Sequence, residues 1–492
     1  MKIYMYLTTI SLLALLATAG TGCRMVDPPR EVSQPWTPPD WAREEQKEDP
    51  VWDSLRDKTI DTSGPLTLIK CADIALMNNP ATRQSWASAR VSAAQVGQAE
   101  SLLYPQVTVS GQGTYLKQKY TMKDDQSGTV NVPDSDEFNY GPALELTYLL
   151  FDFGGVRGGI EEARQILLAA NYSFNQSIQD LLFDVEKAYY TLHSSRSELE
   201  AAEADVADTR TAYEAARQKF EVGLSSKLDE LQTRSSYEDS LYNLEVARGN
   251  VETGKAGLAE VLGLPADAVF TIAPPARELP TEISDADVSG LIEEGLRRRP
   301  DIASLRAQLR AQEAAVDVTG SLLWPSLNLG GSANKLWYSY REDPELYDDS
   351  YLYTGYVSLN WDIFTGFSDR EKKRQAEAQA EVAREQLASA ELQASAEVWT
   401  KFYAFNTAVK KYTFSQAFLE TSRESYDLAL ESYNAGLKSI LDLLQSQSDL
   451  SSARSQLVGS EKDLFIALAD LAHATGSLTL ESITAGATEK RE

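Results

Sequence analysis

Few side chains in this sequence are suited to covalent or metal chemistry. The 492 residues include two Cys and two His, too few to build a Cys/His metal cluster. His193 lies mid-helix in the predicted pattern, among Ser and Thr, and His473 lies near a predicted helix end. Neither accompanies a recognisable nucleophile motif, and no G-x-S-x-G, H-E-x-x-H or phosphate-binding loop occurs. We therefore expect a protein that is not an enzyme and that needs no cofactor or metal.

Cys23 is the residue with the clearest chemical signature. An apolar run over residues 7–19 leads into the small residues G-T-G and then Cys23. This pattern predicts a secretory signal peptide over residues 1–22 and lipid attachment to Cys23. Gly20 stands where lipoprotein signals usually carry Leu, so an ordinary cleaved leader with an incidental Cys stays open. Arg24, rather than Asp, resembles the pattern for sorting of bacterial lipoproteins to the outer membrane.

The charge balance excludes one class of partner. The formal net charge is −27, whereas phosphate backbones are bound by clusters of Lys and Arg. We therefore expect no nucleic-acid partner.

Two distant stretches of the chain are copies of each other. Residues 219–232 (KFEVGLSSKLDELQ) and 432–445 (SYNAGLKSILDLLQ) align without a gap at an offset of 213. A Gly in the left-handed conformation can end one helix, and Ser225 or Ser439 can cap the next, so each stretch predicts a helix–turn–helix tip. A fixed offset indicates a duplicated architecture. The shared positions are Gly223 with Gly436, Leu224 with Leu437, Ser226 with Ser439, Leu228 with Leu441, Asp229 with Asp442, Leu231 with Leu444 and Gln232 with Gln445.

Long helices must lead to and from these tips. Residues 157–220 contain no Pro and almost no Gly. At 1.5 Å per residue they would form a rod of about 95 Å, which is typical of a coiled-coil-like assembly. A second long helix is expected from Arg370 to about Asn434. Many Ala in the second helix would allow close packing of rod on rod, although high helix propensity alone would also explain them.

Alternating residues predict two β-hairpins. Val107 and Val109 alternate with polar residues after Tyr104-Pro105, a polar loop follows over about 117–140, and alternation resumes near Leu144. The second hairpin has the same form after Trp324-Pro325. One apolar and one polar face suit strands of a transmembrane barrel, although a hairpin on a soluble core stays open. No run after the leader approaches the roughly 20 apolar residues of a spanning helix, so any membrane crossing requires a closed barrel.

These features divide the chain into segments. We expect a lipid-bearing extended segment over 23–64, a first repeat over 65–263 and a linker over 264–285. A second repeat over 286–476 and a flexible tail over 477–492 follow. Each repeat reads helix, hairpin, long helix, tip and returning helix, and the first helix is expected over 66–103.

The leader with its Cys, the tandem repeat, the strand-entering Tyr-Pro and Trp-Pro, and the paired G-L-x-S-x-L-D tips together resemble the TolC-like outer-membrane factor family, in its lipoprotein branch. The resemblance covers about residues 66–476. It implies a mainly α-helical fold in which three protomers each give four strands to a 12-stranded membrane β-barrel, continued by a long α-helical barrel through the periplasm. It also implies an outer-membrane exit duct for efflux or type I secretion, supplied by a periplasmic adaptor and an inner-membrane pump.

The resemblance also assigns roles to residues of the tips. Asp442 matches a position that rings the tunnel mouth, and Gln445 stands where the family has a second Asp. Asp229, Tyr433 and Lys438 match positions that hold the mouth shut, with solvated surface charge as the simpler interpretation of Asp229 and Lys438. The expected adaptor-contacting residues of the tips are Gly223, Leu224, Ser226, Gly436, Leu437 and Ser439, for which turn chemistry alone is the simpler interpretation.

One alternative function remains open at this point. A structural periplasmic coiled-coil lipoprotein, with soluble hairpins and no pore, would share the helices and the lipid anchor. The sequence does not identify a cargo.

Overall fold

The computed structural model describes residues 64–118, 121–124, 128–131, 135–275, 287–340 and 347–479. The predicted signal peptide, Cys23 and residues 24–63 of the predicted extended segment lie outside the described residues. So do residues 276–286 of the predicted linker and 480–492 of the predicted tail. All of the described elements belong to one compact unit.

The described residues form eight helices in two matched series. Corresponding helices are equal in length, at 11, 22, 67 and 35 residues. The long pair and the returning pair both repeat at the offset of 213 seen in the sequence. The first series is α4 (Leu68–Asn78), α5 (Pro80–Ser101), α6 (Gly155–Glu221) and α7 (Lys227–Val261), and the second is α8 (Val288–Arg298), α9 (Pro300–Ser321), α10 (Ser368–Asn434) and α11 (Ile440–Ala474).

The single helix expected over 66–103 is divided in two. Pro80 restricts the preceding Asn79 to an extended conformation, with φ −66° and ψ 127°. The Asn79 side chain then caps α5 by accepting a hydrogen bond from the Ala81 backbone N–H at 2.8 Å. Arg299 before Pro300 shows the same break, with φ −62° and ψ 123°.

Four long strands form one antiparallel sheet in the order β1-β4-β5-β6. The stretch expected to be a loop over 117–140 is partly strand, because β1 and β4 extend into it and stay paired as far as Gln118 and Ser135. A separate two-stranded ribbon, β2 with β3, also lies within it. The strands are β1 (Gln106–Gln118), β2 (Thr121–Asp124), β3 (Gly128–Asn131), β4 (Ser135–Phe151), β5 (Ser326–Tyr340) and β6 (Tyr347–Asn360).

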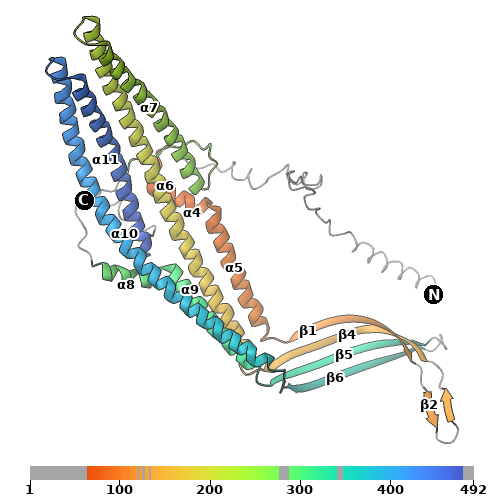
Figure 1. Ribbon diagram of the computed structural model, residues 1–492. Helices are drawn as coiled ribbons and strands as arrows, with labels where there is room; N and C mark the ends of the chain where they lie inside the picture. Colours follow the sequence, from red (N-terminus) through yellow and green to blue (C-terminus); the bar gives the residue numbers. More distant parts are fainter. Residues whose placement is uncertain are drawn as a thin grey trace, which may run out of the picture. The chain divides into compact units, whose positions relative to one another are not determined.

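Figure 1 shows how these elements are arranged within the unit. The four long strands continue from one end of the helices, and the turns that join α6 to α7 and α10 to α11 lie at the opposite end. The predicted mainly helical chain, with four strands that form one sheet, is confirmed. None of the helices among the described residues has the length and apolar character needed to cross a lipid bilayer.

The largest apolar core lies where α4, α6 and α7 meet residues 264–275. Phe270 and Ile272 from this segment are buried, together with Tyr189 of α6. Leu66 forms an isolated parallel bridge with Ile272, and the Tyr189 hydroxyl donates to the Ala273 carbonyl at 2.6 Å. The first part of the predicted linker is therefore packed into the core.

Candidate functional sites at the helix tips and on the strands

The two tips have the same backbone geometry. Gly223 and Gly436 both adopt φ +77°, a conformation that glycine tolerates and most side chains do not. In the first tip the Leu224 N–H donates to the Lys219 carbonyl, and in the second the Leu437 N–H donates to the Ser432 carbonyl, each at 2.8 Å. These bonds close the last turn of α6 and of α10. Both tips therefore end their helices by local hydrogen bonding.

Asp229 and Asp442 complete reciprocal caps at the start of α7 and α11. Each carboxylate accepts the backbone N–H of the capping Ser, at 3.2 Å from Ser226 and 3.0 Å from Ser439. The capping residue of α7 is Ser226 and not Ser225, because the Ser225 hydroxyl instead donates to the Asp229 carboxylate at 2.7 Å. Hydrogen bonds from Ser225 and from Ser439 lower the pKa of Asp229 and of Asp442, respectively. Both carboxylates are thus held ionised by their own tips.

Tyr433 links the second tip to the first. Its side chain is 5% exposed and packs in an apolar cluster formed by α6, α10 and α11. The Lys219 ammonium of α6 lies 4.0 Å from the centre of the Tyr433 ring and also donates to the Tyr433 carbonyl. Burial raises the pKa of the Tyr433 phenol, and the charge of Asp229 raises it further. The structure therefore brings Tyr433 and Asp229 into one neighbourhood.

Lys219 was not singled out by the sequence. Lys219 aligns with Ser432 in the two tip sequences. This difference between the two copies was the signal that could have identified Lys219. Its contact with Tyr433 spans 214 residues of sequence.

Lys438 and Gln445 each make a polar contact within their own hairpin. The Lys438 ammonium lies 3.9 Å from an Asp442 carboxylate oxygen. The Gln445 amide donates to Asp449 at 2.9 Å. Within one chain, the three predicted lock residues are therefore split: Asp229 lies near Tyr433, and Lys438 lies with Asp442. The predicted roles of these residues stay predictions.

Two matching pairs of Leu side chains are exposed at the tips. Leu224 and Leu437 are 78% and 81% exposed, and Leu228 and Leu441 are 62% and 63% exposed. The equal exposure of each pair follows from the repeated backbone. Large apolar side chains gathered at the end of a structure often mark a contact with another protein. Leu228 and Leu441 extend the predicted tip surface.

Arg454 of α11 joins the two hairpins farther from the tips. Its guanidinium pairs with Asp205 of α6 and lies 2.8 Å from Asp208. Ser451 donates to Asp205 at 2.6 Å, and the Tyr426 hydroxyl donates to the Asp208 carbonyl at 3.3 Å. Burial raises the pKa of Asp208, against the attraction of Arg454. Leu241 of α7 occupies the position that matches Arg454 in the first repeat. This difference between the two repeats could have identified Arg454 from the sequence.

A polar groove runs between α7 and α11 over α6. Its volume is about 410 Å³. Its lining includes three carboxylates, those of Glu198, Asp205 and Asp239, and no Lys or Arg among the described residues. Gln447 lies in the lining with its amide oxygen buried and unpaired. The other polar lining residues are Thr209, Ser236, Ser240, Asn243, Asn250, Ser448, Ser451, Ser452 and Ser455.

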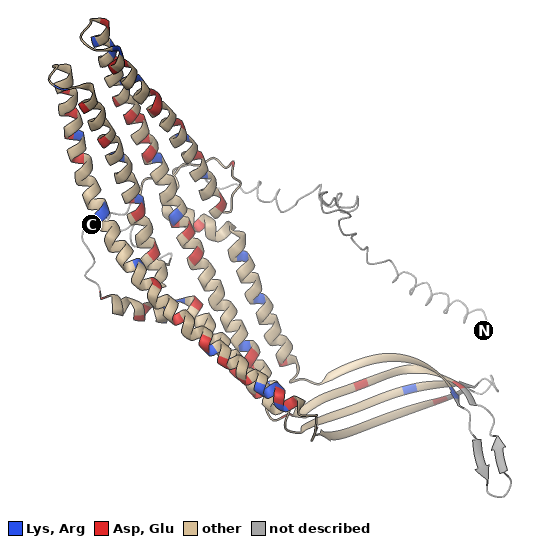
Figure 2. Cartoon of the chain, in the orientation of Figure 1, with Lys and Arg blue, Asp and Glu red and all other residues tan. Residues whose placement is uncertain are grey.

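The four-stranded sheet has one apolar and one polar face. The register places Val107 opposite Leu146, and Leu329 opposite both Tyr148 and Val357. Directly paired residues lie on the same face, so the alternation predicted in each hairpin continues across all four strands. Figure 2 shows few charged residues on these strands and many along the helices. The apolar face carries Val107, Val109, Leu144, Leu146, Tyr148, Leu327, Leu329, Val357 and Leu359, and the polar face carries Thr108, Ser110, Glu145, Thr147, Asn328, Ser332, Thr354 and Ser358.

The remaining chemistry-bearing side chains are held by packing. Cys71 is fully buried, and burial raises the pKa of its thiol to about 12. His473 contacts Asp180 at 2.8 Å, and His193 lies 4.0 Å from Glu461. The described residues contain no group of three or more His, Cys, Asp or Glu placed to hold a metal ion.

Several curated proteins of similar sequence are outer membrane efflux proteins by name. The chain is 28% identical over 324 residues to protein CyaE of Bordetella pertussis, which covers 65% of each protein. It is 26% identical over 311 residues to the outer membrane efflux protein BepC of Brucella suis biovar 1, which covers 63% of each. The matched region thus spans somewhat less than two thirds of these relatives.

Solved structures share the fold. The outer-membrane channel OprN matches with a TM-score of 0.71 at 21% identity, covering 86% of this chain and 98% of that one. The open state of the MtrE outer membrane channel of Neisseria gonorrhoeae matches with a TM-score of 0.69 at 19% identity, covering 93% and 100%. The profile of the outer membrane efflux protein family matches residues 72–264 and 291–477, one segment in each copy of the repeat. With most of its length matched, and with the fold of these channels, the chain belongs to the outer membrane efflux protein family.

Proposed function

We propose that this protein is the outer-membrane exit duct of a tripartite efflux or type I secretion system, passively passing cargo that an inner-membrane pump and a periplasmic adaptor deliver. The observation that carries the proposal is the continuity of two structures. A sheet with an apolar and a polar face passes directly into helices of 67 residues. A lipid-facing wall and a periplasmic wall would thereby be built from one chain.

The duct requires more than one copy of the chain. Four strands leave β1 and β6 as open edges of the described sheet. Open edges are not tolerated in lipid, and the smallest single-chain barrels use eight strands. Three copies, each pairing β1 with a neighbour's β6, would close a 12-stranded barrel by cyclic symmetry.

The tips would form the periplasmic entrance. Three copies of Asp442, with Gln445 one turn along the helix, would narrow the mouth with like charges. Asp229, Tyr433 and Lys438 would hold it closed, helped by Lys219. The adaptor would contact Leu224 and Leu437 with the tip residues Gly223, Ser226, Gly436 and Ser439.

The leader and the segment boundaries belong to the same proposal. Cys23 would carry the lipid that anchors the mature chain to the outer membrane, with residues 23–64 running from it to the repeats. The linker over 264–285 would join the repeats over 65–263 and 286–476, and the tail would begin at 477.

Conductance in a planar bilayer tests the duct. We expect the purified full chain to insert and to conduct weakly, because the proposed lock residues at the tips would hold the mouth closed. Lys219→Met removes the cation that contacts Tyr433 while leaving both capping boxes, so it should raise the conductance several-fold.

Lys255→Met is the matched control, since Lys255 pairs with Glu252 on α7 and is far along the chain from either tip. It should conduct like the parent. Absence of conductance from the parent and from every tip variant, in protein shown to be folded, would instead support a structural lipoprotein without a pore.

A further inference from the structure

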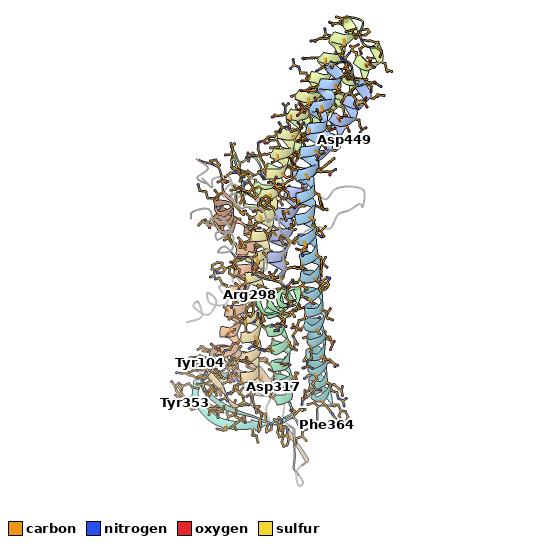
Figure 3. The ribbon with its side chains drawn as sticks, turned by 90° about the vertical axis from the view of Figure 1, so that its left-hand side faces the viewer. Tyr104, Arg298, Asp317, Tyr353, Phe364 and Asp449 are labelled. Carbon is orange, nitrogen blue, oxygen red and sulfur yellow. The ribbon has the colours of Figure 1, made fainter. Side chains whose placement is uncertain are left out.

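The polar groove between α7 and α11 has α6 as its floor (Figure 1). Its residues on each helix recur at the three- and four-residue spacing of a single helix face. Figure 3 places Asp449, which follows the lining residue Ser448 on α11, toward the tips and away from Tyr353 on the strands. The groove therefore lies in the helical part of the chain, outside the strands that we propose to span the membrane.

Hydrogen bonds from α11 fix two levels along the floor of the groove. The Ser455 hydroxyl donates to Glu198 at 2.7 Å, and the Ser451 hydroxyl donates to Asp205 at 2.6 Å. Among the described residues, Asp205 also has an ion pair, with Arg454, whereas Glu198 has none. The charge of Asp205 is therefore offset within the chain, and the charge of Glu198 is met by a neutral hydroxyl.

A third level lies one helical turn closer to the tips. Thr209 follows Asp205 by one turn of α6, and its hydroxyl lies 2.7 Å from the Ser240 hydroxyl of α7. Asp239 precedes Ser240, and its carboxylate accepts a hydrogen bond from the Asn243 amide at 3.2 Å. In the described part of the chain, Asp239 has no ion pair. The groove thus has a carboxylate without a cationic partner near each end.

Gln447 adds a buried acceptor at the tip-side end. It precedes Ser451 by one turn of α11, which places it at the level of Thr209. Its side chain is 6% exposed, and its amide oxygen is buried without a hydrogen-bond partner in the described chain. Buried acceptors in folded proteins are nearly always paired, because leaving one unmade is costly. This oxygen therefore points to a ligand that carries an N–H donor.

The negative charges of the groove are spread out rather than gathered. Glu198 and Thr209 are eleven residues apart on α6, which is about 16 Å along the helix axis. The described residues contain no group of three or more His, Cys, Asp or Glu placed to hold a metal ion. The groove therefore suits a cation whose charges are separated along a chain, and not a single metal ion.

The middle of the groove is partly apolar. Ala202 of α6 lies between the levels of Glu198 and Asp205, and Val246 and Ala247 of α7 also line the groove. No Lys or Arg occurs in this lining among the described residues. Methylene groups pack on apolar side chains, and ammonium groups pair with carboxylates. A chain of methylene groups with an ammonium group at each end meets both conditions.

We propose that the groove is a binding site for a linear aliphatic polyamine. One outer ammonium group pairs with Glu198. The other pairs with Asp239 and donates a hydrogen bond to the amide oxygen of Gln447, and the methylene chain lies along Ala202 and Val246. The bound polyamine would contact α6, α7 and α11 together. This site goes beyond the proposed function and does not depend on it.

Isothermal titration of the full chain in detergent with spermine tests the site. Spermine is the probe because its outer ammonium groups, when extended, span the length between the two ends of the groove. The ionic strength is about 0.15 M, at which attraction to distant exposed charges is largely screened. We expect saturable binding of one spermine per chain. Putrescine is too short to reach both ends and should bind more weakly, and Mg²⁺ at equal ionic strength should not displace spermine.

Variants at the two ends of the groove identify the residues that hold the ligand. Glu198→Gln with Asp239→Asn should weaken spermine binding about tenfold, because two exposed ion pairs are lost. Gln447→Leu keeps the charge and removes the unpaired oxygen, so it should weaken binding several-fold while the ligand-free chain melts at an equal or higher temperature. Glu420→Gln with Glu424→Gln is the matched control, since it removes the same charge from exposed positions of α10 that do not line the groove. This control should bind spermine like the parent.

Three results would overturn the site. The first is the absence of saturable spermine binding to the folded parent chain. The second is equal weakening in the groove variant and in the control, which would assign the binding to the net charge of −27. The third is unchanged binding in Gln447→Leu, because the buried oxygen is the group that distinguishes the groove from an acidic surface. None of these measurements depends on conductance, so the site and the duct are tested separately.

Discussion

At the scale of single residues, Arg454 is a side chain outside the tips whose loss should lower the stability. Its exposed fraction is 21%, and it faces Asp205 and Asp208 across the contact between α11 and α6. Arg454→Met would leave both carboxylates without their cation. Removing one partner of a buried pair costs about 3–5 kcal/mol, and partial exposure reduces this to about 1–2 kcal/mol. Denaturant unfolding followed by circular dichroism measures the loss.

Arg423→Met is the control for that change. Arg423 is exposed on α10, and exposed substitutions usually stay within about 0.5 kcal/mol. Replacing Asp205 and Asp208 by Asn in the Arg454→Met background should restore part of the stability. An equal loss in both Arg variants would show that the cluster contributes nothing specific.

The loss of stability at acidic pH should depend on the tip carboxylates. Hydrogen bonds from Ser225 and from Ser439 lower the pKa of Asp229 and Asp442 below the ordinary 3.8. A carboxyl with a lowered folded pKa contributes stability above its unfolded pKa and loses it as pH falls through the folded value. Ser225→Ala with Ser439→Ala should therefore be less stable than the parent at pH 7, and the part of the difference that is due to ionisation should vanish as the pH falls below the lowered folded pKa values. An unfolding series across that range checks the sign, and a gap that widens in acid would contradict it.

At the scale of elements, the tips are decided by glycine conformation. Gly436 has φ +77° with no atom near an added Cβ, so Gly436→Ala costs backbone strain alone, about 1–2 kcal/mol. Gly249 lies inside α7 with equal space around it. Gly249→Ala should instead stabilise the helix by about 0.5–1 kcal/mol. Thermal melting of the two variants should shift in opposite directions, and a shared direction would refute a left-handed tip.

At the scale of the whole molecule, the open strand edges predict the assembly. Thr108→Cys on β1 is combined with Thr354→Cys, Tyr356→Cys or Ser358→Cys on β6, one at a time. We expect at least one of these three double variants to form disulfides between chains. A non-reducing gel should then show a ladder ending at three chains. Thr147→Cys on β4 with the same β6 variants is the control, because β4 is already paired on both sides. A ladder that ends at another number of chains would contradict the proposed trimer.

The sequence by itself determined the features that depend on neighbouring residues. The tips follow from a Gly, a Ser and an Asp within seven positions, and the two-faced sheet follows from alternation, so both were predicted. The same local signals led to the family, which the matched segments confirm. The roles of Asp229, Tyr433, Lys438, Asp442 and Gln445, and the segment boundaries, stay predictions.

Only the tertiary structure decided which distant side chains meet. Lys219 lies against Tyr433 and Arg454 lies between Asp205 and Asp208, across more than 200 residues of sequence. Phe270 and Ile272 are buried although their segment looks like a Pro-rich linker. The physical reason is that such contacts depend on which faces of the packed helices turn toward each other. The local propensities of the residues do not specify which helix faces pack together.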